Sequence, residues 1–160
     1  MDNFLNNLPA LADLKRNPGT QNRTLFEVNG HIHSPYSFSA FTNVRQIVDL
    51  AMAEKVEVLG INDFYTTGGY REFHDLTVAN GIFPLFNIEF IALDRKLQQE
   101  GIRVNDPNNP GRIYFSGKGL DYPEVPDAAR MATVDSVISE SHRQVREMVI
   151  KTNEVLSGLK

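Results

Sequence analysis

Short apolar runs alternate with helical patterns through the first two thirds of this chain. The runs predicted as strands are 24–28, 56–61, 82–91 and 112–116, where β-branched and aromatic residues gather. Helices with one apolar face are predicted between the first three runs, over 43–55 and 68–80. Strands that alternate with helices build βαβ units, so the pattern predicts an α/β fold with about four parallel strands in an open sheet or a partial barrel.

The lengths of these segments also predict the domain organisation. Residues 1–22, rich in Asn and broken by Pro9, Pro18 and Gly19, are expected to form an N-terminal arm with one short helix around 8–14. With 160 residues and 41% apolar content, the rest of the chain can bury one sizeable core. A single domain over 23–160 is the resulting expectation.

The composition excludes several classes of function. The chain has no cysteine, which excludes disulfides, thiolate zinc sites and a cysteine nucleophile, so any metal must bind to His, Asp or Glu. The formal charge of −4 argues against nucleic acid and anionic membranes as partners. No apolar run reaches the roughly 18 residues of a membrane span, and the N-terminus lacks the pattern of a signal peptide. A cytoplasmic protein is therefore expected.

Metal-binding residue types follow three of the predicted strands. His31 and His33 follow the first strand, Asp63 the second, and Glu89 lies near the end of the third. Because the carboxyl ends of parallel strands open on one edge, these side chains are expected to lie on one face of the fold. Imidazole and carboxylate ligands suit Zn, Mn or Fe. Asp63 has two open interpretations, as a cap of the following helix or as a metal ligand or orienting group.

The same residues carry a resemblance to a known family. Residues 28–37 resemble the first motif of PHP (polymerase and histidinol phosphatase) domains, a strand ending in His-x-His followed by Ser. Residues 58–64 are similar to the second motif, an apolar strand ending in Asp-His, and 87–89 resemble the Gly-x-Glu step. The resemblance implies a distorted β/α barrel with metal ions at its mouth that hydrolyses phosphoesters. It further implies that His31, His33, Glu89 and Asp63 are metal ligands and that Asp63 has a catalytic role.

Several positions depart from the family pattern. Phe64 stands where the second motif has a ligand His, Phe38 and Ser39 replace polar or ligating groups, and the later His and Asp-x-His motifs have no counterpart. The pattern thus predicts only the first four strands of the barrel. The expected function is that of a metal-dependent phosphoesterase that acts on a small phosphorylated substrate. The chain is expected to be the front part of a longer enzyme and to have little activity alone. The alternative is a catalytically inactive module that binds a ligand or partner through the same mouth.

The remaining segments carry weaker expectations. Gly117-Lys118-Gly119 lacks the spacing of a phosphate-binding loop and predicts a turn. His74 and His142 fall in predicted helices and are expected on the surface or in packing. A long helix is predicted over 127–156, capped by Asp127. This helix is expected either to cover the open side of the partial barrel or to mediate self-association through its apolar face, which contains Val145, Met148, Val149 and Thr152.

Overall fold

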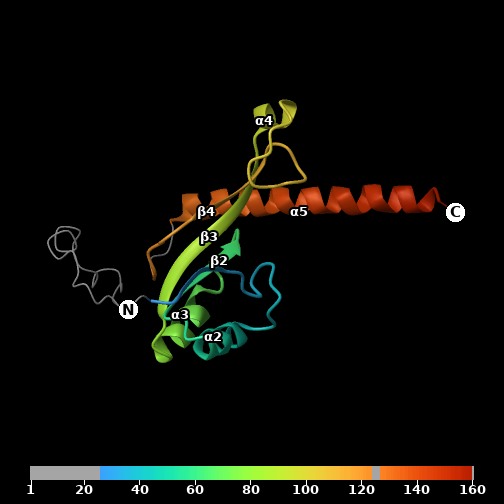
Figure 1. The fold of residues 1–160 in the computed structure, drawn as a ribbon. Helices are drawn as coiled ribbons and strands as arrows, with labels where there is room; N and C mark the ends of the chain where they lie inside the picture. Colours follow the sequence, from blue (N-terminus) through green and yellow to red (C-terminus); the bar gives the residue numbers. More distant parts are fainter. Residues whose placement is uncertain (1–25, 124–126, 160) are drawn as a thin grey trace. The chain divides into compact units, whose positions relative to one another are not determined.

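The computed structural model describes residues 26–123 and 127–159 and divides the chain into two compact units, with the boundary between residues 124 and 125 (Figure 1). The first unit contains β1 (Val28–Ile32), α2 (Val44–Ala53), β2 (Val58–Phe64), α3 (Tyr70–Ala79), β3 (Phe83–Leu93), α4 (Arg95–Gln99) and β4 (Arg112–Gly117). The second contains α5 (Ala128–Ser157). The predicted arm over 1–22 and its short helix lie outside the described residues.

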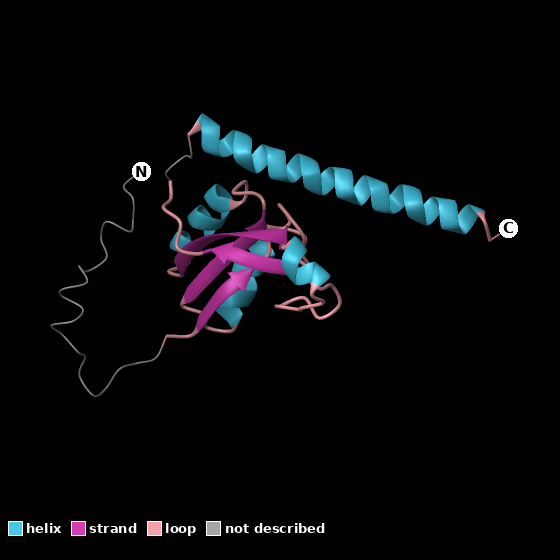
Figure 2. Ribbon diagram, turned by 90° about the horizontal axis from the view of Figure 1, so that it is seen from above, coloured by secondary structure: helices cyan, strands magenta, loops and turns pink. Residues whose placement is uncertain are grey.

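The four strands form one sheet in the order β1-β2-β3-β4, which curls into a half-barrel (Figures 1 and 2). Strands β1, β2 and β3 are parallel, as the βαβ pattern predicts. The prediction that the fourth strand is also parallel is wrong, because β4 runs antiparallel to β3. The segment between them contains only the five-residue α4 and folds back on itself, so that the Asp94 N–H donates to the Gly111 carbonyl at 2.8 Å. A connection that folds back in this way places β4 antiparallel to β3. A parallel neighbour would need a longer connection that crosses back to the start of the sheet.

Two strand boundaries differ from those expected. The first strand covers Val28–Ile32 rather than 24–28, so Asn29, Gly30 and His31 lie inside it, and its pairing with β2 slips in register before Ile32. The third strand continues past Glu89 to Leu93, because its last six residues pair with β4. Glu89 therefore lies within β3, opposite the end of β2.

The helices α2 and α3 pack on one face of the sheet, on the same side in Figure 1. Helix α2 begins where expected, since the Asn43 side chain accepts from the Gln46 N–H at 2.8 Å and satisfies one of the free donors of the first turn. Helix α3 ends before Gly81, whose φ of 72° is the left-handed conformation that glycine adopts without strain. The core between helices and sheet contains Val44, Ile47, Val48, Ala51, Leu59, Ile61, Phe73 and Phe86.

The opposite face of the sheet is polar. Side chains alternate along a strand, so the neighbours of the core residues Ile61 and Phe86 point to the other side. There the parallel register pairs Asn62 with Asn87, and both are buried. Antiparallel pairing with β4 adds Ser116 opposite Glu89. One face of the sheet thus holds the hydrophobic core, and the other holds the polar groups of the candidate site.

The second unit is one long helix. Asp127 caps α5 as predicted, with its side chain accepting from the Arg130 N–H at 2.9 Å, and the helix runs for 30 residues to Ser157. None of the residues in α5 is fully buried. No helix in the described ranges combines the length and the apolar character needed to cross a membrane.

Candidate metal centre

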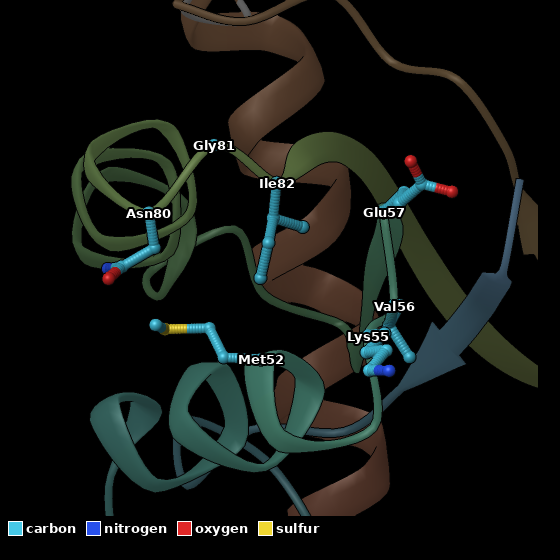
Figure 3. Close-up of a pocket in the computed structure, with 7 residues that line it drawn as sticks. All are labelled: Met52, Lys55, Val56, Glu57, Asn80, Gly81 and Ile82. Atoms are coloured by element: carbon cyan, nitrogen blue, oxygen red, sulfur yellow. The ribbon is translucent and has the colours of Figure 1, made fainter.

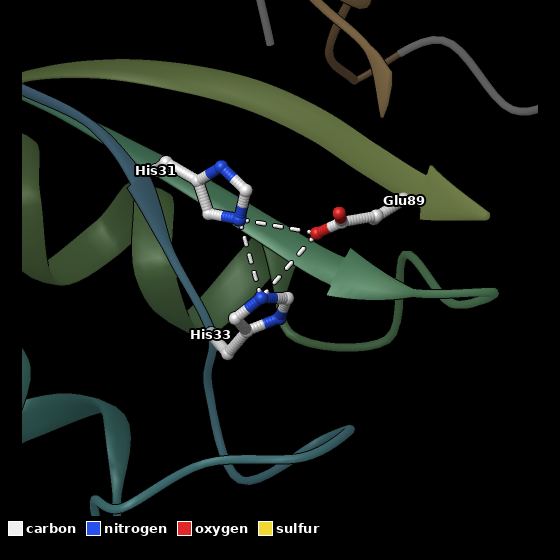
Figure 4. Close-up of side chains that lie close together, drawn as sticks. All are labelled: His31, His33 and Glu89. Atoms are coloured by element: carbon white, nitrogen blue, oxygen red, sulfur yellow. Dashed lines mark hydrogen bonds and ion pairs between the residues drawn. The ribbon is translucent and has the colours of Figure 1, made fainter. Parts of the chain in front are cut away.

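Three ligating side chains converge on the polar face of the sheet (Figure 4). The Nε2 atoms of His31 and His33 are 3.2 Å apart. The Glu89 Oε2 atom lies 3.1 Å from the first of these nitrogens and 3.3 Å from the second. The structure therefore brings three of the four residues singled out in the sequence to one point.

The strands explain why these side chains meet. His31 lies in β1 and His33 follows it by two residues, so both rings project to the same side of the sheet. Glu89 reaches the same point from β3 across β2, because the register places it opposite Phe64 at the end of β2. The Glu89 side chain is only 7% exposed, whereas that of His31 is 48% exposed, so the cluster opens to solvent on the His31 side.

The three donor atoms are spaced as a divalent ion requires. Zinc bonds of about 2.0–2.1 Å to nitrogen and oxygen place neighbouring ligand atoms of a tetrahedron roughly 3.3 Å apart. The observed separations of 3.1, 3.2 and 3.3 Å agree with this spacing. Two imidazoles and one carboxylate also form a donor set that Zn, Mn and Fe accept. The residues present therefore fit a divalent metal.

The environment of His33 favours the form of imidazole that binds metals. Its ring stacks on the Phe64 ring, with centroids 4.9 Å apart and planes at 11°. Burial lowers the pKa of the His33 imidazole, and the Glu89 carboxylate opposes this effect only in part. A lowered pKa leaves the ring neutral at pH 7, with a lone pair available for an ion. Phe64, where the PHP pattern that the sequence resembles has a ligand His, instead packs its apolar ring against His33.

An amide and an ammonium group lie next to the three donors. The Asn62 Nδ2 atom donates to Glu89 Oε2 at 2.7 Å and lies 3.0 Å from His31 Nε2. The Asn62 Oδ1 atom accepts from Lys118 Nζ at 2.8 Å, and the same ammonium contacts the Gly30 carbonyl at 3.3 Å. Burial lowers the pKa of the Lys118 ammonium, with Glu89 opposing the shift. A lysine cation is therefore anchored beside the candidate metal centre.

Asp63 lies apart from the three donors. It is completely buried, and its Oδ1 accepts from the Ser34 N–H at 2.6 Å and from Ser37 Oγ at 2.7 Å, while Oδ2 accepts from Ser34 Oγ at 2.5 Å. It does not cap α3, whose N-terminal cap is Gly69 without a side-chain hydrogen bond. Asp63 instead fixes the loop that follows His33.

Sequence reasoning missed three residues of this site. Asn62 directly follows the predicted strand 56–61 and lies inside β2 in the structure. Ser116, at the end of β4, accepts from Asn62 Nδ2 at 3.3 Å, and Lys118 belongs to the turn after β4. The sequence does hold a signal, since Ser116 and Lys118 are two residues apart and so fall on the same side of an extended chain. That signal identifies the site only once the antiparallel pairing of β3 and β4 is known.

Two other features of the first unit lie away from the donors. His74 pairs with Asp75 at 3.1 Å on α3. His142 belongs to α5, in the second unit. The pocket in Figure 3 is lined by Met52, Lys55, Val56, Glu57, Asn80, Gly81 and Ile82. These residues precede β2 and β3, so this pocket lies at the opposite end of the parallel strands from the metal centre.

Comparison with known proteins finds similarity in structure only. No family model and no curated protein matches the sequence. A candidate metal-dependent phosphoesterase from Bifidobacterium adolescentis matches 46% of this chain and 26% of its own, with 24% identity and a TM-score of 0.41. An amidohydrolase from Chromobacterium violaceum, solved with bound sulfate and no metal, matches 76% of this chain and 37% of its own, with 24% identity and a TM-score of 0.56. This chain thus spans well under half the length of either, and its likeness to the amidohydrolase shows a shared fold.

Proposed function

We propose that this chain carries the metal centre of a PHP-type phosphoesterase that hydrolyses a small phosphorylated substrate. The observation that carries the proposal is the convergence of His31, His33 and Glu89 donor atoms at 3.1–3.3 Å from one another. These residues come from the first and third of the PHP-like motifs, and the order of all three motifs along the chain supports the PHP type. The shared fold with an amidohydrolase is consistent with this proposal.

Different residues would have different roles in such a metal centre. His31, His33 and Glu89 would hold a divalent ion, which would supply an activated water and a Lewis acid for a phosphoryl oxygen. Asn62 donates to Glu89 Oε2 and so holds the carboxylate in its ligating orientation. Asp63 holds the loop after His33 through Ser34 and Ser37, which is the orienting role that we propose for it.

Lys118 favours an anionic substrate. Its ammonium is fixed by the Asn62 Oδ1 and Gly30 carbonyl oxygens beside the three donors. A cation held in place there stabilises the negative charge that a phosphoryl group carries through its transfer. An amide is neutral when it binds and becomes charged only in its tetrahedral intermediate, so Lys118 favours a phosphoester at the binding step.

A second candidate function is a non-catalytic module that binds a ligand through the same face. Phe64 stacks on His33 where the family pattern has a further ligand. The Asn62 amide already contacts both His31 Nε2 and Glu89 Oε2, so the cluster is held together by its own hydrogen bonds. Both observations are consistent with a module that retains the arrangement of the three donors but does not catalyse a reaction.

Hydrolysis of 4-nitrophenyl phosphate by the full 160-residue chain, with Mn²⁺ or Zn²⁺ added, tests the two functions. We expect slow, metal-dependent release of nitrophenol that the E89Q variant loses. Metal-dependent binding of inorganic phosphate without turnover would favour the non-catalytic module. Hydrolysis that persists in a chelator, or that is equal in E89Q, would contradict the proposal.

A further inference from the structure

A stripe of mainly apolar residues along α5 follows a heptad pattern that the candidate metal centre does not use. Steps of three and four residues alternate along the whole helix, and we call the resulting stripe the α5 seam. The seam consists of Met131, Val134, Ile138, Ser141, Val145, Met148, Thr152 and Val155. A repeat of 3.5 residues keeps one stripe facing a partner helix in a left-handed supercoil, which is the pattern of a coiled coil.

Charged groups lie on the other side of the helix. Arg143 pairs with both Glu140 and Glu147, at i,i+3 and i,i+4 spacing. In the heptad that places Val145 and Met148 on the seam, these three residues occupy outward positions. The ion pairs of Arg143 with Glu140 and Glu147 therefore lie outside the seam.

Thr152, a polar residue of the seam, is already satisfied within the helix. Its Oγ1 donates to the Met148 carbonyl at 2.8 Å. A buried hydroxyl is costly only when it lacks a hydrogen-bond partner. Thr152 can therefore turn its methyl group to a neighbouring helix without a penalty for an unpaired hydroxyl.

The length of the seam identifies its partner. From Met131 to Val155 the seam spans roughly 36 Å at a rise of 1.5 Å per residue. The helices α2 and α3 have ten residues each, roughly 15 Å, so neither matches it. Among the helices of the described ranges, only another α5 offers an equal apolar stripe. We propose that α5 pairs with the α5 of a second copy of this chain along the seam, as a coiled coil.

Helix α5 does not itself cover the large apolar side chains in the C-terminal half of the seam. Val145 is 56% exposed, Met148 61% and Val155 65%. An apolar stripe of this length in water favours association, and burying it against an identical stripe removes both from solvent. The pairing joins two chains and is independent of the metal centre.

Sedimentation equilibrium of the full chain at low micromolar concentration tests the pairing. The chain mass is 18.0 kDa, so a pair has twice that mass. The test variant is Val145→Glu, on the seam, and the matched control is Ile150→Glu, on the outward face with a similar exposure of 50%. We expect the wild type and the control to sediment as pairs and Val145→Glu to dissociate at least tenfold more readily.

Two outcomes would overturn the proposal. One is a wild-type chain that remains monomeric at about 100 micromolar, which would assign the seam to packing within one chain. The other is equal weakening by both substitutions, or by neither. A second seam variant, Met148→Lys, must behave like Val145→Glu, and far-ultraviolet circular dichroism verifies that each variant retains its helix.

Discussion

At the scale of single residues, the site depends on a few buried polar groups that hold the ligating side chains in place. Asp63 accepts three hydrogen bonds from the Ser34–Ser37 turn, and Asn62 links Glu89 to Lys118. Such groups stabilise a fold only while every donor and acceptor is paired, because an unpaired buried group retains its full desolvation cost. Substitutions at these positions therefore test the described geometry directly.

The Asp63→Asn substitution is expected to destabilise the chain by about 3 kcal/mol, because an amide nitrogen then faces donors that now have a carboxylate acceptor. The measurement is the free energy of unfolding in urea. Asp49→Asn is the matched control, since Asp49 is exposed and pairs with Arg45 on α2, where the expected loss is below about 0.5 kcal/mol. Equal losses for the two variants would show that the Asp63 hydrogen bonds carry no special weight.

Lys118→Met is expected to weaken the binding of inorganic phosphate to the metal-loaded chain by about tenfold, because the fixed cation beside the donors is lost. Lys118→Arg should restore part of that affinity. The affinity for the metal itself should change little, since Lys118 is not one of the three donors. Isothermal titration with phosphate measures the first effect. Unchanged phosphate affinity in Lys118→Met would remove this residue from the proposed substrate site.

At the scale of helices and strands, the close approach of β1 and β2 sets the position of the two histidines. A Cβ atom at Gly60 would lie 2.6 Å from the Gly30 carbonyl oxygen and 2.9 Å from Asn87 Nδ2, which is too close for any side chain. A Cβ at Gly30 would meet no atom within 4 Å. These two glycines form a matched pair, one in a crowded place and one in an open place.

Gly60→Ala is accordingly expected to destabilise the chain by about 1–3 kcal/mol, as overpacking does, and to weaken metal binding by moving β1 away from β3. Gly30→Ala should leave both properties nearly unchanged. Urea unfolding and metal titration of the two variants provide the measurement. A Gly60→Ala chain with native stability and metal affinity would contradict the described strand spacing.

The elements also show which features local sequence determines. The cap at Asn43, the left-handed Gly81 and the same-side placement of His31 and His33 follow from local rules of helix and strand geometry, and all three were predictable. The direction of β4 was not predictable. It depends on the path of the segment between β3 and β4, and the apolar periodicity of the sequence contains no information on that path. Asn62, Ser116 and Lys118 were missed for this reason, since their meeting depends on the pairing of β4 with β3.

At the scale of the whole molecule, two units carry two separate properties. The half-barrel sheet brings three side chains that could hold a metal ion to its polar face, and α5 carries a mainly apolar seam of heptad spacing. The matched amidohydrolase chain is considerably longer, and this chain spans 37% of it. The proposed phosphoesterase activity and the proposed pairing of chains can therefore be tested independently of each other.

The central claim is that His31, His33 and Glu89 together bind one divalent ion. Isothermal titration of Zn²⁺ or Mn²⁺ into the metal-free full chain tests it most directly. The account predicts one ion per chain and a loss of affinity of about 100-fold or more in each of H31A, H33A and E89Q, since removing even the groups behind a ligand costs about 10–100-fold. The H74A variant, which lacks a histidine remote from the three donors, should bind as the wild type does. Absence of binding, or binding that all three ligand variants retain, would contradict the account.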